Sequence, residues 1–123
     1  MIQPTLSGAD LRGAALRGAK LRGALMANAR LDGADLQGAD LIGATLCRAS
    51  LQGVDLRKAL MVDADLAGAD LRRADLRGAI LDGANLEGAD LTDAIFDPAQ
   101  LSQCRGLRSA KPSGLYVMVA RIK

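Results

Sequence analysis

The sequence predicts an all-β solenoid, a chain wound into stacked coils with leucine and alanine inside. The first observation is a five-residue phrase, clearest from Gly33 to Leu41, which repeats without a break from Leu6 to Leu101. Leucine fills 17 of its 20 centre positions, and alanine fills 18 of the 20 positions two residues before the centre. Glycine occupies 12 of the positions two residues after the centre, where it permits a bend.

A period of five fits neither a regular helix nor a continuous strand. A helix turns about 100° per residue, so successive leucines would rotate by about 140° per unit and form no stripe. In a continuous strand the side chains alternate with a period of two, so successive leucines would point to opposite faces. Short extended segments separated by bends satisfy the pattern, because each alanine and leucine then points to one axis.

The three-residue phrase Ala-Asp-Leu resembles the repeat of the pentapeptide-repeat protein family, and the match covers about Pro4 to Gln103. The phrase is clearest at residues 34–36, 39–41 and 69–71. The resemblance implies a right-handed quadrilateral parallel β-helix with four units per coil. About five coils then follow, at residues 4–23, 24–43, 44–63, 64–83 and 84–103, and a strand spacing of ~4.8 Å gives a rod of roughly 24 Å.

Two regions are expected, a β-helix over residues 1–103 and a C-terminal loop with a capping strand over residues 104–123. The first five residues are too short for a substantial cap, so the first coil is expected to present an open edge. A partner chain, an upstream domain or plain exposure would each be compatible with that edge. The core is expected at the centre positions, among them Leu36, Leu41, Leu56, Leu76 and Phe96.

The C-terminal region breaks the five-residue pattern. A turn is expected at Lys111–Gly114, and the segment Leu115–Lys123 predicts a strand because it is rich in β-branched residues. Solenoid ends need covering, which favours a capping role for this strand. A strand that pairs with a second copy of the chain is the alternative.

The composition argues against an enzyme and against a cofactor. The chain has no histidine, which removes the commonest general base, and it has neither a Walker-type phosphate loop nor a Gly-x-Gly-x-x-Gly motif. The cysteines, Cys47 and Cys104, form no metal-binding or disulfide pattern. A convex rod filled with leucine and alanine is expected to lack a deep pocket that would perturb a carboxyl pKa. With no leader sequence and no long apolar run, a cytoplasmic location is expected.

The charge is unevenly distributed along the chain. Residues 1–103 carry 11 basic and 14 acidic residues, a net charge of −3, whereas residues 104–123 carry five basic residues and no acidic residue. With twenty residues per coil, an acidic row at Asp35, Asp55 and Asp75 stacks beside a basic row at Arg17, Arg57 and Arg77. These rows are expected to neutralise each other.

Two other groups of outward side chains are candidate sites. Apolar residues stack on consecutive coils of one face and form a candidate protein interface, at Ile42, Leu60, Val62 and Ile80. The first coil carries a candidate basic patch at Arg12, Arg17, Lys20 and Arg22. The chain lacks an aromatic stacking platform, so this patch predicts at most weak, salt-sensitive binding of nucleic acid.

Two main functions therefore compete. The first is a non-enzymatic interaction module that binds a protein partner or a second copy of itself through its outer faces. The second comes from the family resemblance, since some pentapeptide-repeat proteins imitate duplex DNA and occupy the DNA site of gyrase, which protects it from quinolones. A duplex of ~24 Å carries about 14 phosphates. The net charge of −3 is far smaller than the charge of such a duplex, so the interaction module is favoured. Neither a membrane nor a metal is expected as a partner.

Overall fold

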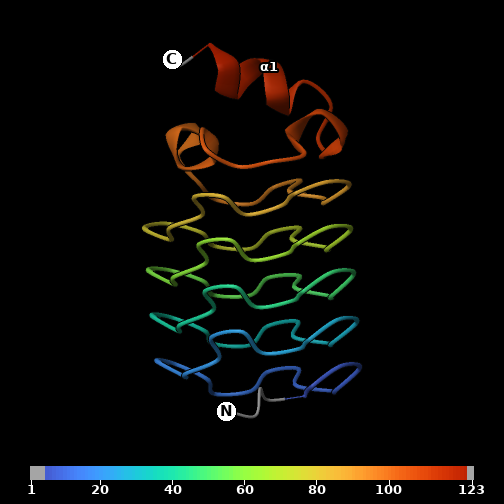
Figure 1. Ribbon diagram of the computed structural model, residues 1–123, viewed down its shortest axis with the longest axis vertical. Coiled ribbons are helices and arrows are strands. Elements are labelled where there is room, and N and C mark those ends of the chain that lie inside the picture. Colours follow the sequence, from blue (N-terminus) through green and yellow to red (C-terminus); the bar gives the residue numbers. More distant parts are fainter. Residues whose placement is uncertain (1–4, 122–123) are drawn as a thin grey trace.

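A computed structural model describes residues 5–121 and shows a solenoid of stacked coils (Figure 1). Parallel backbone bridges join residues twenty positions apart, from Thr5↔Leu25 to Asn85↔Arg105, so one coil contains four five-residue units. Within the described range these bridges are isolated, and each sheet is a column of single paired residues rather than a set of longer strands. The expectations for residues 1–4, 122 and 123 lie outside the described residues.

The bend in each unit is a four-residue turn. In the unit at Leu36, the N–H of Ala39 donates to the carbonyl of Leu36 at 3.0 Å, and Gly38 has a φ of 65°. A positive φ at the third turn residue alone is the pattern of a type II turn, which favours glycine there. Arg48, Lys58 and Arg73 occupy the same position in other units and also adopt positive φ values, of 58°, 60° and 61°. The coil therefore imposes this conformation on residues that ordinarily avoid it.

Backbone hydrogen bonds tie each coil to the coils on both sides. The N–H of Leu36 donates to the carbonyl of Asp55 in the next coil at 2.8 Å, and the N–H of Asp35 donates to the carbonyl of Ala14 in the preceding coil at 2.9 Å. This pattern recurs along the stack. The bonds keep the coils in register, with residues twenty positions apart side by side.

The aspartate that precedes many centre residues has a local backbone role. The carboxylate of Asp55 accepts the N–H of Arg57 at 3.1 Å, and the carboxylate of Asp75 accepts the N–H of Arg77 at 3.1 Å. Asn85 makes the same contact with the N–H of Glu87. Such a bond between a side chain and the backbone two residues later is typical of Asp and Asn at turns. The preference for these residues in the repeat is therefore a turn preference.

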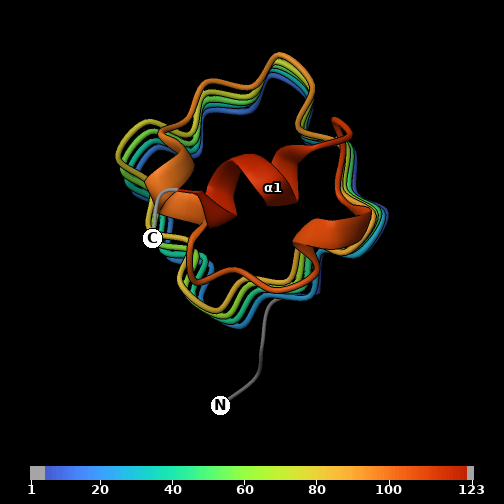
Figure 2. The ribbon, with the colours of Figure 1, turned by 90° about the horizontal axis from the view of Figure 1, so that it is seen from above.

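The core is a column of leucines that runs along the axis. Leu36, Leu41, Leu56 and Leu76 lie in this column and are buried. Phe96 is only partly buried and packs against the end of the column, because the coil stack gives way to the cap there. Figure 2 looks along the rod and shows the coils superimposed around this axis.

The cap consists of three short helical segments. They are η1 at Pro98–Leu101, η2 at Leu107–Ser109 and α1 at Leu115–Ala120. Helix α1 lies across the end of the coil stack (Figures 1 and 2). The coils and the cap form a continuous hydrophobic core, since Leu115 and Val119 belong to the same cluster as the leucine column.

The predicted capping strand at Leu115–Lys123 is wrong, because its described part forms α1. A strand would bury alternate residues, but Val117 is 50% exposed while Leu115 and Val119 are buried. Residues four apart share one face of a helix, and that face covers the end of the core. Contact with the coil end therefore outweighs the intrinsic β preference of the valines.

Candidate functional site

The outer surface carries most of the polar and charged side chains, in columns of residues twenty positions apart. Two outward positions flank each centre residue, one before it and one after it. Two groups of stacked residues are relevant to function. The ion-pair face consists of Arg17, Asp35, Gln37, Asp55, Arg57, Asp75 and Arg77, and the apolar patch consists of Ile42, Leu60, Val62 and Ile80.

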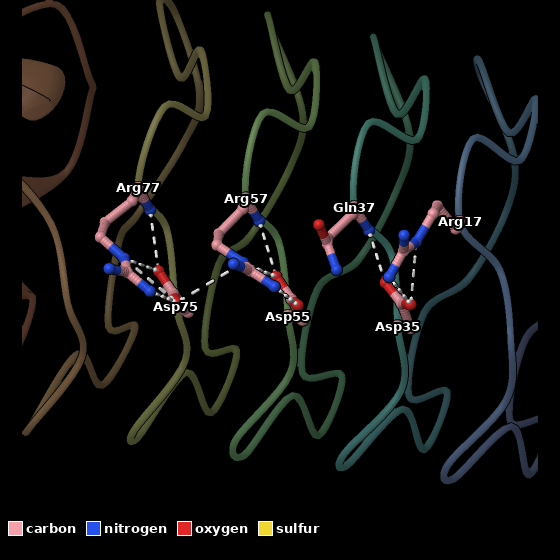
Figure 3. A network of polar contacts seen from close by, with 7 residues as sticks. All are labelled: Arg17, Asp35, Gln37, Asp55, Arg57, Asp75 and Arg77. Carbon is pink, nitrogen blue, oxygen red and sulfur yellow. Dashed lines mark hydrogen bonds and ion pairs between the residues drawn. The ribbon is translucent and has the colours of Figure 1, made fainter.

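The ion-pair face is a ladder of Arg–Asp contacts that runs along several coils (Figure 3). Arg57 and Asp55 approach to 2.8 Å and Arg77 and Asp75 to 2.6 Å within single units. Arg57 also lies 3.8 Å from Asp75, which links adjacent coils. The predicted neutralisation of the acidic row is therefore visible as direct ion pairs.

The carboxylates on this face are held in their ionised form. Hydrogen bonds from the side chains of Arg57 and Arg77 lower the pKa values of Asp55 and Asp75, despite partial desolvation. For Asp35, the backbone N–H of Gln37 makes the largest contribution to its lowered pKa. Carboxyl groups with lowered pKa values are poor proton donors near neutral pH, so this face is not arranged for general acid catalysis.

The structure brings the four residues of the apolar patch together on one face. Leu60 and Ile80 are joined by a parallel bridge, and the N–H of Gly43 donates to the carbonyl of Val62 at 2.9 Å, which places Ile42 and Val62 on adjacent coils. Ile80 is 45% exposed, whereas Ile42, Leu60 and Val62 are each partly exposed. Because none of these side chains belongs to the core, the patch has apolar surface available for a partner.

Charged residues bound the apolar patch at both ends. Lys20 and Arg22 lie on the coil that precedes Asp40 and Ile42, and Arg22 contacts Asp40 at 2.9 Å. At the other end, Asp82 follows Ile80 and is exposed. The patch is therefore flanked by positive charge toward the N-terminal end of the rod and by negative charge toward the cap.

The predicted basic patch is largely neutralised in the structure. Arg12 contacts Asp10 at 2.7 Å, Arg17 contacts Asp35 at 3.0 Å, and Arg22 contacts Asp40 at 2.9 Å. Arg12 lowers the pKa of Asp10 to about 2 through its side-chain hydrogen bond. Lys20, the remaining member of the patch, is exposed. The pairing of the arginines reduces the local positive potential that binding to phosphates would need.

The cap contains a cavity that the sequence did not predict. Its volume is about 540 Å³, and its lining includes Cys104, Leu107, Arg108, Tyr116 and Val119. The guanidinium of Arg108 lies 4.1 Å from the centre of the Tyr116 ring and donates to the Tyr116 hydroxyl at 2.9 Å. The expectation of no deep pocket concerned the convex rod, whereas most residues that line this cavity belong to the cap.

The cysteine in this cavity is not set up as a nucleophile. The thiol of Cys104 donates to the carbonyl of Leu81 at 3.2 Å, and burial raises its pKa to about 12. A thiol with such a pKa is almost entirely protonated near neutral pH. Cys47, the second cysteine, is partly exposed on the outer surface of a coil.

Sequence reasoning also missed the apolar surface of the cap helix. Tyr116, Val117 and Met118 are exposed on α1, and Ile95 is exposed at the end of the column that carries the acidic row. The four-residue spacing of Leu115 and Val119 was the available signal for a helix with one buried face.

Among residues 5–121, no His, Cys, Asp or Glu cluster is arranged to hold a metal ion, and no helix is long and apolar enough to cross a membrane.

A family model described as pentapeptide repeats matches this chain in 8 copies. The matched segments overlap and together extend over residues 5–105, as 5–43, 24–61, 39–78, 59–97 and 69–105. No curated protein sequence matches the chain significantly.

Several solved structures share the fold. The crystal structure of Rfr23, a pentapeptide repeat protein from the cyanobacterium Cyanothece 51142, is 35% identical over 76% of this chain and 59% of that one, with a TM-score of 0.63. A trypsin-treated variant of QnrB1, a plasmid-mediated fluoroquinolone resistance protein, is 22% identical over 91% of this chain and 56% of that one, with a TM-score of 0.80. Full-length QnrB1 is 21% identical, covers 89% of this chain and 60% of its own, and has a TM-score of 0.67. The chain thus spans less than two thirds of the length of each of these proteins.

Proposed function

Because this chain belongs to the pentapeptide-repeat family, we propose that it is a non-enzymatic interaction module that docks a protein through the apolar patch. The observation that carries the proposal is the stacking of Ile42, Leu60, Val62 and Ile80 on consecutive coils of one face, at positions that hold polar residues in most other units of the repeat. The rod would consist of about five right-handed coils, as the family fold implies.

The coil scaffold suits such a role. Its backbone is hydrogen-bonded from coil to coil, and the interior is filled with leucine and alanine, so little movement of the outer positions is expected. Outward residues on a rigid scaffold lose little further conformational freedom on binding, which lowers the entropic cost of docking. A small apolar patch on such a face can therefore contribute usefully to affinity.

The test uses substitutions that the repeat itself tolerates. Asp is the commonest residue at the positions of Leu60 and Ile80, where it can accept the N–H of the residue two positions later. The double variant Leu60→Asp/Ile80→Asp should therefore fold, and circular dichroism and thermal unfolding would verify this. Ile95→Asp is the matched control, because Ile95 occupies the same repeat position on another face and is also exposed.

Proteins captured from a lysate of the source organism would be compared among the three forms. We expect specific partners to be retained by the wild type and by Ile95→Asp and lost from the double variant. The mass of the purified protein in solution would show whether the retained protein is a second copy of the chain. Retention of the same set of proteins by a folded double variant would reject the apolar patch as the docking surface.

The competing proposal is a DNA mimic that acts on gyrase. The likeness to QnrB1 supports it only through the shared fold. The ion-pair face weakens it, because Asp35, Asp55 and Asp75 each contact an arginine and so do not present a row of unpaired charge. A gyrase supercoiling assay separates the two proposals. Strong inhibition at micromolar protein that survives Leu60→Asp/Ile80→Asp would favour the mimic.

A further inference from the structure

We propose that the occupant of the apolar patch is a second copy of this chain, docked face to face with its rod antiparallel. This inference rests on the proposed function, because it names the partner of the same patch. The face of the rod that carries the apolar patch has four layers, one per coil, and each layer has two outward residues. In order along the rod, the layers are Lys20/Arg22, Asp40/Ile42, Leu60/Val62 and Ile80/Asp82, joined by the parallel bridges Lys20↔Asp40, Asp40↔Leu60 and Leu60↔Ile80.

The charge pattern on this face is self-complementary only when one copy is inverted. Two positive side chains lie in the first layer, and Asp82 lies in the fourth. The side chain of Arg22 is 65% exposed although it contacts Asp40. A guanidinium carries five N–H donors, so Arg22 can keep Asp40 and still bind a second carboxylate.

A parallel dimer is unfavourable on this face. A two-fold axis along the rod places each layer against the same layer of the partner. The column of residues 20, 40, 60 and 80 then faces the partner's column of residues 22, 42, 62 and 82. Lys20 would then face the partner's Arg22, and Ile80 would face the partner's Asp82. The first contact brings like charges together and the second sets a carboxylate against an apolar side chain, both of which are costly at an interface.

An antiparallel dimer gives matched contacts. Its two-fold axis lies in the interface, perpendicular to the rod and between the second and third layers. Rotation about this axis reverses the order of the layers along the rod. Each column of outward residues then faces the same column of the partner. Arg22 then faces the partner's Asp82, and Ile42 faces the partner's Val62, and symmetry produces each contact twice.

The two remaining contacts of this register are acceptable. Lys20 faces the partner's Ile80, and its aliphatic stem can cover that side chain while its ammonium group stays in water. Asp40 faces the partner's Leu60, but its carboxylate keeps hydrogen bonds from Arg22 at 3.0 Å and from the N–H of Ile42 at 3.1 Å. Moving the axis onto the third layer would instead pair Ile42 with the partner's Asp82, so the charge pattern selects one register.

The size of the face predicts a weak, reversible dimer. Four layers spaced ~4.8 Å apart and a face about three to five extended residues wide give roughly 200–300 Å² per copy. A stable interface usually buries about 800 Å² per partner. Measurements must therefore extend to about 1 mM protein, and association should weaken as salt screens the Arg22–Asp82 contacts.

The test is a charge exchange across the proposed axis, read by sedimentation velocity over a concentration series. Arg22→Glu and Asp82→Arg should each abolish the concentration-dependent dimer, since each places like charges opposite one another. The combined variant Arg22→Glu/Asp82→Arg should restore it in part, because the partner of each new charge is again opposite while Asp40 still lacks its hydrogen bond from Arg22. Arg77→Glu makes the same charge change on the ion-pair face and should leave the dimer unchanged.

A cross-link tests the register independently. Residues 22 and 82 lie three layers apart within one chain, about 14 Å, which is too far for an internal disulfide. In a background of Cys47→Ala/Cys104→Ala, the pair Arg22→Cys/Asp82→Cys should form a covalent dimer on mild oxidation. Arg77→Cys/Arg22→Cys should not, since Arg77 lies on another face.

A wild-type protein that remains monomeric at about 1 mM would overturn the antiparallel dimer. A dimer that persists unchanged in both single charge variants, or that the combined variant does not restore, would also overturn it. Neither result would reject the proposed function. The function fails separately, when folded Leu60→Asp/Ile80→Asp retains every captured protein.

Discussion

In the coils, backbone groups of neighbouring turns satisfy one another. At the cap some of these backbone bonds continue, as from the N–H of Leu91 to the carbonyl of Lys111, but at other positions a side chain takes the place of the backbone partner. The N–H of Ile80 donates to the carbonyl of Ala59 at 3.0 Å, and one coil later the carbonyl of Ala79 receives the side-chain amide of Gln100 at 2.8 Å instead. The backbone N–H of Gln100 is bonded within η1, to the carbonyl of Asp97. Similarly, the N–H of Gly88 donates to the hydroxyl of Ser109.

This difference shows how stability is distributed in the molecule. In the coil stack each pair of neighbouring coils makes an equivalent set of contacts, so the free energy of unfolding should be nearly a sum over neighbouring coils. At the cap a few side chains have roles that no other residue duplicates.

The largest expected effect is a cavity in the middle of the stack. Leu56→Ala removes a fully buried side chain that has coils on both sides, so the free energy of unfolding should fall by about 2–5 kcal/mol. For Leu115→Ala in α1, the loss of free energy of unfolding should be near the lower end of that range, because the cap can relax around a smaller residue. Urea unfolding would measure both, and a larger loss for Leu115→Ala would contradict the contrast.

The second effect concerns the side chain that replaces a backbone donor at the cap. Gln100→Ala leaves the carbonyls of Leu76 and Ala79 without the amide that donates to them at 2.7 and 2.8 Å. Loss of these partly buried bonds should cost about 1–3 kcal/mol in urea unfolding. The exposed Gln103 provides the control, and Gln103→Ala should change stability by less than about 0.5 kcal/mol.

The third effect has the opposite sign. Arg48 and Lys58 adopt the positive φ that most units assign to glycine. Arg48→Gly and Lys58→Gly should each stabilise the coils by up to about 1 kcal/mol, because a side chain disfavours this conformation. Gly33→Ala should destabilise by a similar amount. Equal melting temperatures for all of these variants would show that the coil does not strain this position.

The smallest expected effect is a decrease in stability at acidic pH. The pKa values of Asp55, Asp75 and Asp90 are lowered in the folded chain by hydrogen bonds from Arg57, Arg77 and Thr92 respectively. Groups with lowered folded pKa values contribute stability above their unfolded value of about 4, and this contribution is lost as pH falls through the folded values. The urea midpoint should therefore be flat from about pH 7 to 5 and decrease below about pH 4. For Asp90→Asn this acid-dependent decrease should be shallower.

The coil stack was largely predictable from the sequence because one rule repeats. The buried positions of Leu36, Leu41, Leu56 and Leu76 follow from a period of five and the need to keep leucines together. The grouping of the apolar patch on one face follows from twenty residues per coil. The left-handed conformation of Arg48 was not predictable, since the residue's own preference opposes it and only the neighbouring coils enforce it.

The cap was not predictable to the same degree, because it occurs once and has no repeat to confirm it. The valines of α1 favoured a strand, while the spacing of Leu115 and Val119 favoured a helix, and only contact with the coil end decides between them. The cation–π contact of Arg108 with Tyr116 depends on that helix. The neutralisation of Arg12 and Arg22 likewise depends on side-chain directions, which the repeat pattern does not determine.

The twenty-residue register has a consequence for how such a chain can change length. Duplicating twenty residues would lengthen the rod by one step and leave every existing column aligned. Duplicating a single unit of five would instead rotate everything beyond it by a quarter turn, so that an insertion between Asp40 and Leu60 would carry Leu60 and Ile80 to the adjoining side. Gain or loss of one unit would thus redistribute surface chemistry around the molecule while its interior stayed the same.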